Sequence, residues 1–294
     1  MGTAKMGPLI FSMALPAMIS MIINALYNIV DSIFVAKYSQ DALAAVSLVY
    51  PLQMLVVAIG VGTGVGVNSL IARRLGERRQ KHADSAAEHG VALAVVGGIA
   101  FFILGWGFSG VFVGAFGASE AVSAYAIQYS HLAVGMSIFV MISMMCEKIQ
   151  QSGGNMIIPM CQGLTGAIIN IILDPLMIFG IGPFPEMGIR GAALATVLAQ
   201  AVSVVCALAI LCRKKLPFTF RKSDVRLNEQ CRRFLTIGLP LALQEFLTQL
   251  SFLALCAFVN RLGLAASSGY GVASKIVSFV MLVPSALMQS MASF

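Results

Sequence analysis

Eight apolar runs follow one another along the chain, and they leave it little choice of fold. They lie near residues 9–36, 48–72, 86–113, 120–146, 157–180, 189–212, 232–260 and 265–294. Each is long enough to cross the hydrocarbon core of a bilayer, which is roughly 30 Å thick. Because that core holds no water, each span must satisfy its own backbone hydrogen bonds and must therefore be a helix. We predict an all-α, polytopic membrane protein embedded in a lipid bilayer.

The composition agrees with this fold class. Of the 294 residues, 59% are hydrophobic and 11% are charged, whereas soluble domains carry about 25% charged residues. The net charge of +7 could also suit a nucleic-acid-binding protein, but the basic residues fall in predicted loops, so we expect no nucleic-acid partner. The six cysteines form no CxxC motif and no pairing with histidine, so we predict neither a disulfide framework nor a cysteine metal site.

The basic residues predict the orientation. Three of them, Lys37, Arg190 and Arg261, fall on one side of the membrane, and Lys275 lies inside the eighth run. The fifteen on the other side are Lys5, Arg73, Arg74, Arg78, Arg79, Lys81, Lys148, Arg213, Lys214, Lys215, Arg221, Lys222, Arg226, Arg232 and Arg233. Since cytoplasmic loops carry the excess of Lys and Arg, we expect a cytoplasmic N-terminus in a multi-pass protein of a bacterial plasma membrane.

A polar, basic segment divides the chain. We predict a first lobe of six helices over residues 1–212, a cytoplasmic linker over 213–231, and helices seven and eight over 232–294. When the sequence is aligned with itself at one constant shift, Leu15-Pro16 matches Leu239-Pro240 and Lys37 matches Arg261. Because six spans separate these segments, they are parallel repeats, a pattern found in secondary transporters. A complete second repeat needs roughly 150 further residues and four more spans, so we expect the sequence to be cut short.

A polar stripe runs along the first apolar run. Ser20, Asn24, Tyr27, Asn28 and Asp31 are spaced by three or four residues, so they share one helix face about 100° wide. Asp31 is the one charged residue between positions 13 and 36. A carboxylate at this depth is costly unless it faces a polar cavity or a partner, which makes it a functional hypothesis. The alternative is a structural hydrogen bond to a neighbouring helix.

Other runs carry polar residues to a similar depth. Asp31 and Asp174 each lie six residues before the outer end of their runs, so the constant rise of a helix brings them to one level. Asn170 shares a helix face with Asp174, and Thr196 lies at comparable depth on the sixth run. The residues that we predict to line a substrate cavity are Asn24, Tyr27, Asn28, Gln128, His131, Gln200, Glu245 and Lys275, although a lone histidine such as His131 is more often a packing residue.

Two carboxylates in one poorly solvated pocket repel each other. One of them can therefore take up a proton near neutral pH. With Asn170, Thr196 and backbone carbonyls, Asp31 and Asp174 could instead hold a bare monovalent cation through oxygen ligands. Either event neutralises charge in the pocket, and this could shift the equilibrium between two packing arrangements of the helices. The residues leave open which ion is used.

These residues resemble the multidrug and toxic compound extrusion (MATE) family, which belongs to a wider group containing lipid and polysaccharide flippases. The matching stretches are Asn28-Ile-Val-Asp31, Gln151-Ser-Gly-Gly-Asn-Met156, Asn170-Ile-Ile-Leu-Asp174-Pro and Gly188-Ile-Arg-Gly-Ala-Ala-Leu-Ala-Thr196. The resemblance implies a non-enzymatic antiporter of two six-helix lobes, which exports small, cationic, amphipathic organic compounds in exchange for Na⁺ or H⁺. It further implies a cation site at Asp31, Asn170, Asp174 and Thr196, no cofactor besides the coupling ion, and a monomer when full length.

Three other functions remain open from the sequence. A flippase for lipid-linked substrates would favour basic residues along the cavity, whereas the predicted layer is acidic. An intramembrane aspartyl protease would favour a Gly-Asp motif, but Ser32 follows Asp31 and Leu173 precedes Asp174. The third alternative is a truncated fragment that does not transport.

Overall fold

The protein is all-helical throughout the residues that the computed structural model describes, which are 6–115, 119–213, 229–261 and 264–291. The helices are α1 (Met6–Tyr38), α2 (Gln40–Gly76), α3 (Gln80–Gly107), α4 (Ser109–Gly114), α5 (Glu120–Ala133), α6 (Ile138–Ser152), α7 (Ile157–Ile178), α8 (Ile189–Arg213), α9 (Glu229–Arg261) and α10 (Leu264–Met291). The predicted fold class is confirmed. Residues 214–228, which make up most of the predicted linker, lie outside the described part.

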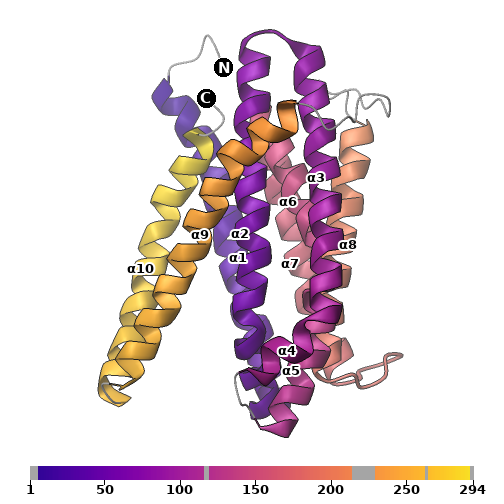
Figure 1. Cartoon of the computed structure of the whole chain (residues 1–294), viewed down its shortest axis with the longest axis vertical. Coiled ribbons are helices and arrows are strands. Elements are labelled where there is room, and N and C mark those ends of the chain that lie inside the picture. Colours follow the sequence, from indigo (N-terminus) through magenta and orange to yellow (C-terminus); the bar gives the residue numbers. More distant parts are fainter. Residues whose placement is uncertain (1–5, 116–118, 214–228, 262–263, 292–294) are drawn as a thin grey trace.

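The long helices run side by side along the long axis of the molecule (Figure 1). The turn between α2 and α3 lies at one end, which we call the basic end because it carries Arg73, Arg74, Arg79 and Lys81. There Arg74 donates a hydrogen bond from Nη1 to Oε2 of Glu77 at 3.0 Å, which lowers the pKa of the Glu77 carboxyl group. The loop between α7 and α8 lies at the opposite end, which we call the loop end.

The helices have the length and composition of membrane spans. Within the described residues, α1, α2, α3, α7 and α8 are each long and apolar enough to cross a bilayer. The predicted fourth run, 120–146, is not one straight helix, because α5 and α6 meet at a bend of 45°. Gly135 explains the break without a proline, since a Cβ there would overlap the carbonyl oxygen of His131 and lie 2.6 Å from Nε1 of Trp106.

Small residues bring together helices α1–α8, which correspond to the predicted first lobe. A Cβ on Gly90 of α3 would lie 2.8 Å from Cγ1 of Val67 on α2 and 3.1 Å from Sδ of Met145 on α6. Glycine at such positions lets helix backbones approach closely, which is how helices associate where lipid removes the hydrophobic driving force. Lys148 is also part of this packed interior, and the prediction that it belongs to a basic loop is wrong: it lies in α6 and is 6% exposed.

The last two helices repeat the first two. α9 begins at Glu229 where α1 begins at Met6, and α10 begins at Leu264 where α2 begins at Gln40. The spacing along the sequence between the two helix starts of each pair equals the spacing between Leu15 and Leu239 to within one residue. The helices α1 and α9 are equal in length at 33 residues, and each contains the aligned proline, Pro16 or Pro240.

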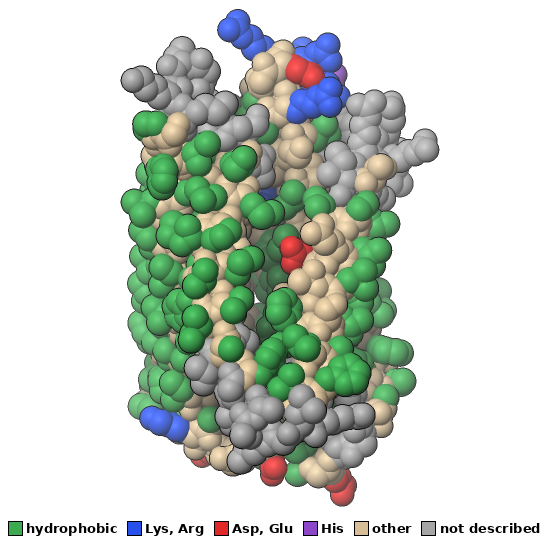
Figure 2. All heavy atoms as spheres, turned by 90° about the vertical axis from the view of Figure 1, so that its left-hand side faces the viewer, with side chains coloured by type: hydrophobic (Ala, Val, Ile, Leu, Met, Phe, Trp, Pro, Cys, Tyr) green, Lys and Arg blue, Asp and Glu red, His purple; other side chains and the backbone are tan. Residues whose placement is uncertain are grey.

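The α9–α10 pair touches the first lobe chiefly in its basic-end half. Of its described side chains, those that are buried are Gly238, Ala242, Ala286 and Ser290, all nearer the basic end than the loop end. Farther along, α9 and α10 diverge from α1 and α2 (Figure 1). Figure 2 shows the face on the α10 side, where hydrophobic side chains cover most of the height and Lys and Arg gather at the basic end.

Candidate functional site

The structure brings Asp31 of α1 against Asp174 of α7. α1 packs along α7, and α7 packs along α8, so these three helices form one wall of the first lobe. The two carboxyl groups lie within hydrogen-bonding reach of each other. Asp174 is 0% exposed, while Asp31 is half-buried. Asp31 is therefore the more accessible of the two carboxyl groups.

Asn170 and Thr196 complete the group. Asn170 lies one helical turn before Asp174 and is 2% exposed. Its Nδ2 donates to Oδ1 of Asp174 and to Oγ1 of Thr196, each at 3.2 Å. Thr196 in turn donates from Oγ1 to the carbonyl oxygen of Ala192 at 3.1 Å. All four residues predicted at the cation site thus lie together, on three different helices.

Three oxygen atoms at this site are buried without a hydrogen-bond partner. They are Oδ1 of Asp31, Oδ1 of Asn170 and Oδ2 of Asp174. Within the described residues, neither Asp31 nor Asp174 forms an ion pair with a cationic side chain. A buried polar atom without a partner costs free energy, and more so when it is charged. The site therefore favours a ligand that supplies positive charge, and a proton or a small cation does so.

The sequence prediction missed two residues beside the carboxyl groups. Tyr129 of α5 is 4% exposed and lies close enough to Asp31, Asp174 and Tyr27 to interact with them electrostatically. Its hydroxyl oxygen accepts a hydrogen bond from Nε2 of Gln53 of α2 at 3.2 Å, which leaves the hydroxyl proton available to a carboxylate. The available signal was the presence of Gln53 inside an apolar run, where an amide also needs a partner.

The predicted residues of α5 face other partners. Gln128 accepts a hydrogen bond through Oε1 from Nε of Arg190 at 3.1 Å. The ring of His131 stacks on Trp106, with centroids 4.9 Å apart and planes 7° from parallel. Since adjacent residues on a helix point about 100° apart, the face that carries Tyr129 toward the site turns these two side chains elsewhere.

The remaining predicted cavity residues are scattered. Tyr27 lies close enough to both aspartates to interact electrostatically, whereas Asn28 is exposed and donates from Nδ2 to the carbonyl oxygen of Asn24 at 2.8 Å. Gln200 is half-buried on α8, and Glu245 is exposed on α9. The side chain of Lys275 lies outside the described residues, so its predicted pairing with Glu245 stays a prediction.

Aromatic side chains cover the site on the side of the loop end. Phe34 lies almost one turn beyond Asp31 and meets Phe179 edge-on, with ring centroids 6.4 Å apart. Farther out, Tyr38 packs on Gly188, which has φ +55°, and lies within hydrogen-bonding reach of Tyr125. These contacts lie between the carboxyl groups and the loop end.

Helices long enough to span a membrane that enclose carboxyl groups without a cationic partner are typical of membrane transporters. Comparison with known families is more specific. Residues 16–176, more than half of the chain, match the MatE family, and the chain therefore belongs to the MATE family of transporters.

Known relatives agree with this assignment. The chain is 26% identical over 294 residues to the FAD transporter of Shewanella oneidensis, and this alignment covers 99% of the chain and 65% of the relative. It is 30% identical over 268 residues to "Probable multidrug resistance protein NorM" of Thermotoga maritima, covering 89% of this chain and 56% of the relative. A solved MATE transporter in an outward-facing conformation is 26% identical with a TM-score of 0.87, over 97% of this chain and 63% of its own. The chain thus covers less than two thirds of the length of each of these relatives.

Proposed function

We propose that the protein, in a form with two complete lobes, is a secondary active antiporter. It exports small, cationic, amphipathic organic compounds in exchange for Na⁺ or H⁺. In this proposal Asp31, Asn170, Asp174 and Thr196 bind the coupling ion, and the space between the lobes carries the exported compound. The basic end faces the cytoplasm, because Lys and Arg are concentrated there.

One observation carries the proposal: the buried oxygens of Asp31, Asn170 and Asp174 that have no partner. Carboxylate and amide oxygens are ligands for a hard cation, and a proton shared by two close carboxyl groups would relieve the same repulsion. An ion that binds here changes the charge between α1 and α7. A ligand shifts the equilibrium between two conformations only if it binds one of them more tightly than the other. The change of charge between α1 and α7 can provide this difference in affinity.

The class of exported compound is inferred from charge and from relatives. Several relatives are named as multidrug export or resistance proteins, including MepA of Staphylococcus haemolyticus. The exposed carboxylate of Glu245 and the half-buried Asp31 would attract cations toward the space between the lobes. Another relative, the FAD transporter, is named for an anionic cofactor. A flippase of lipid-linked substrates, whose cargo is also anionic, fits the acidic site less well.

The test is a comparison of Asp31→Asn with Asp41→Asn. The first change removes a charge from the site but keeps a side chain that can hydrogen-bond; the second removes an exposed charge at the start of α2. If Na⁺ binds, it should stabilise the purified chain by about 1.4 kcal/mol at ten times its Kd. We expect Asp31→Asn to lose this stabilisation and Asp41→Asn to keep it, as measured by thermal unfolding in NaCl against choline chloride.

Ion-driven efflux by the two-lobe form, normalised to folded protein, completes the test. We expect Asp31→Asn to abolish efflux, and Asn170→Ala to weaken the response to Na⁺ more than the response to a pH gradient if Na⁺ is the coupling ion. Equal loss of both responses would indicate H⁺ coupling. Normal efflux by a folded Asp31→Asn protein would show that this carboxyl group is only structural, and the proposed function of the site would be wrong.

A further inference from the structure

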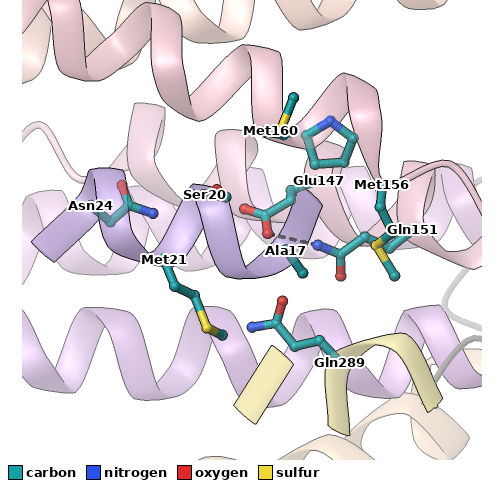
Figure 3. Close-up of a pocket in the computed structure, with 10 residues that line it drawn as sticks. Ala17, Ser20, Met21, Asn24, Glu147, Gln151, Met156, Met160 and Gln289 are labelled. Carbon is teal, nitrogen blue, oxygen red and sulfur yellow. Dashed lines mark hydrogen bonds between the residues drawn. The ribbon is translucent and has the colours of Figure 1, made fainter. Parts of the chain in front are cut away.

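A second polar cavity lies between the first lobe and α10, toward the basic end. It has a volume of about 60 Å³ and is lined from α1 by Ser20 and Asn24, from α6 by Glu147 and Gln151, and from α10 by Gln289. In Figure 3 the side chains of Glu147, Gln151 and Gln289 point into the space between these helices. On α1, Ser20 lies three helical turns from Asp31, or about 16 Å along the helix. The cavity is therefore distinct from the site of the two aspartates.

Glu147 is the charged group in the lining of this cavity, and a neighbouring glutamine holds it in place. Its Oε1 accepts a hydrogen bond from Nε2 of Gln151 at 2.7 Å. The Oε1 of Gln151 accepts another from Nζ of Lys148 at 3.0 Å, and that Nζ lies 4.0 Å from Oε1 of Glu147. These contacts engage one oxygen of the Glu147 carboxylate, and its Oε2 makes no hydrogen bond or ion pair within the described part of the chain.

Lys148 does not reach into the cavity. Its stem packs on Gly64 of α2, where a Cβ would lie 2.8 Å from Cγ of the lysine. The lysine is 6% exposed and does not belong to the lining, whereas the side chain of Glu147 is 35% exposed. A ligand in the cavity therefore meets the negative member of this pair first, with the positive member behind it.

The rest of the lining suits a positively charged hydrogen-bond donor. Ser20, Asn24 and Gln289 offer oxygen acceptors from two different helices. Methionine side chains, including Met21, supply a polarizable apolar wall that adapts to organic groups. An anion would be repelled by Glu147, and a purely apolar group would leave the polar lining without partners. The volume suits the ammonium end of a molecule and not the whole of an amphipathic compound.

We infer that this cavity binds the ammonium end of an organic cation, through the carboxylate of Glu147 and the amides of Asn24 and Gln289. The inference rests on the proposed export of organic cations, and it assigns the charged end of the cargo to a site apart from the ion site. Because Gln289 belongs to α10, the site is complete only when α10 lies against α1. Separation of the two lobes at the basic end removes Gln289 from the site.

The test uses two ligands of similar shape, 4-phenylbutylammonium and uncharged 4-phenylbutanol, with the purified chain. We expect the ammonium compound to bind more tightly, as measured by equilibrium dialysis. Glu147→Gln should weaken its binding about tenfold to a hundredfold, the range for a lost hydrogen bond to a charged group. Glu120→Gln, which removes an exposed carboxylate at the start of α5, should leave the affinity unchanged. Gln289→Ala should weaken it severalfold and provides the same test from α10 if Glu147→Gln does not fold.

A cysteine placed at Ser20 locates the bound ligand. In a background without the six native cysteines, 4-phenylbutylammonium should slow alkylation of Ser20→Cys but not of Ser12→Cys, which is exposed on the same helix. Equal binding of the two ligands, or unchanged affinity in folded Glu147→Gln, overturns the inference. The proposed ion site fails by a different result, namely an unchanged response of Asp31→Asn to Na⁺, so the two failures are distinguishable.

Discussion

Gly62 of α2 lies in close contact with α9, and replacing it with alanine should force the two helices apart. A Cβ on Gly62 would lie 2.5 Å from Cβ, 2.6 Å from N and 2.7 Å from Cα of Ala242 on α9. Carbon atoms in contact prefer separations of about 3.5–4.0 Å. Gly62→Ala therefore requires α9 to move away from α2 by about 1 Å, the difference between these separations. Because two of the three close atoms are backbone atoms, Ala242→Gly should not rescue the variant.

The cost of this overlap sets the size of the effect. Overpacking of a well-packed contact typically costs about 1–3 kcal/mol. Alanine also stabilises a helix interior by about 1 kcal/mol relative to glycine, but α2 is helical whether the lobes are together or apart, so this gain cancels in the equilibrium between the two arrangements. A shift of about 1–3 kcal/mol changes a two-state equilibrium by about 5–150-fold. The population in which the lobes separate at the basic end should increase by that factor.

Alkylation of a cysteine at Gln289 measures this population. Gln289 lies at the contact between α10 and the first lobe, so its replacement by cysteine should react faster when the lobes separate. We expect Gly62→Ala to increase the rate about 5–150-fold in a background without native cysteines. Gly76→Ala is the matched control on α2, because a Cβ there meets nothing within 4 Å. An unchanged rate in a folded Gly62→Ala protein would refute the idea that the α2–α9 contact holds the basic end closed.

Two further predictions concern the loop end and the orientation. Gly188→Ala should lower the free energy of unfolding more than Gly182→Ala does. Both glycines have positive φ, at +55° and +76°, and this backbone conformation costs alanine about 1–2 kcal/mol at either position. The difference lies in packing, because a Cβ on Gly188 overlaps the ring of Tyr38 whereas one on Gly182 meets nothing within 4 Å. Thermal unfolding measures both, and equal losses would show that Tyr38 moves aside freely. Lys81→Cys should react with an impermeant thiol reagent from the cytoplasmic side and Asp41→Cys from the outside; the reverse pattern in intact cells would invert the topology.

Much of the candidate ion site could be predicted because helix geometry converts sequence spacing into depth. Asn170 and Asp174 share a face by their spacing of four residues, and Asp31 reaches the same level by counting from the end of its helix. These relations hold for any straight helix that crosses a bilayer. The structure adds the contact between α1 and α7, which counting alone could not establish.

Depth does not determine how a helix is rotated about its axis, and the prediction for α5 was incomplete for this reason. Gln128, Tyr129, Ser130 and His131 follow one another and point to different sides. In a soluble protein the apolar face would indicate the orientation, but lipid is as apolar as the interior of the lobe, so that signal is weak. The bend after α5 was missed as well, because it depends on the close approach of Gly135 to Trp106 of α3, a contact between segments that are distant in the sequence.

α1 connects the two sites that the structure suggests. Ser20 and Asp31 are separated by three helical turns and about 20° more, so they lie on nearly the same face. In the first lobe this helix packs on α7 beside Asp174, and toward the basic end it packs on α10 beside Gln289. Coupling between two sites requires a physical element whose equilibrium both of them bias. A change of charge at Asp31 acts on the packing of α1 against α7, and any movement of α1 that follows also moves Ser20 relative to Glu147.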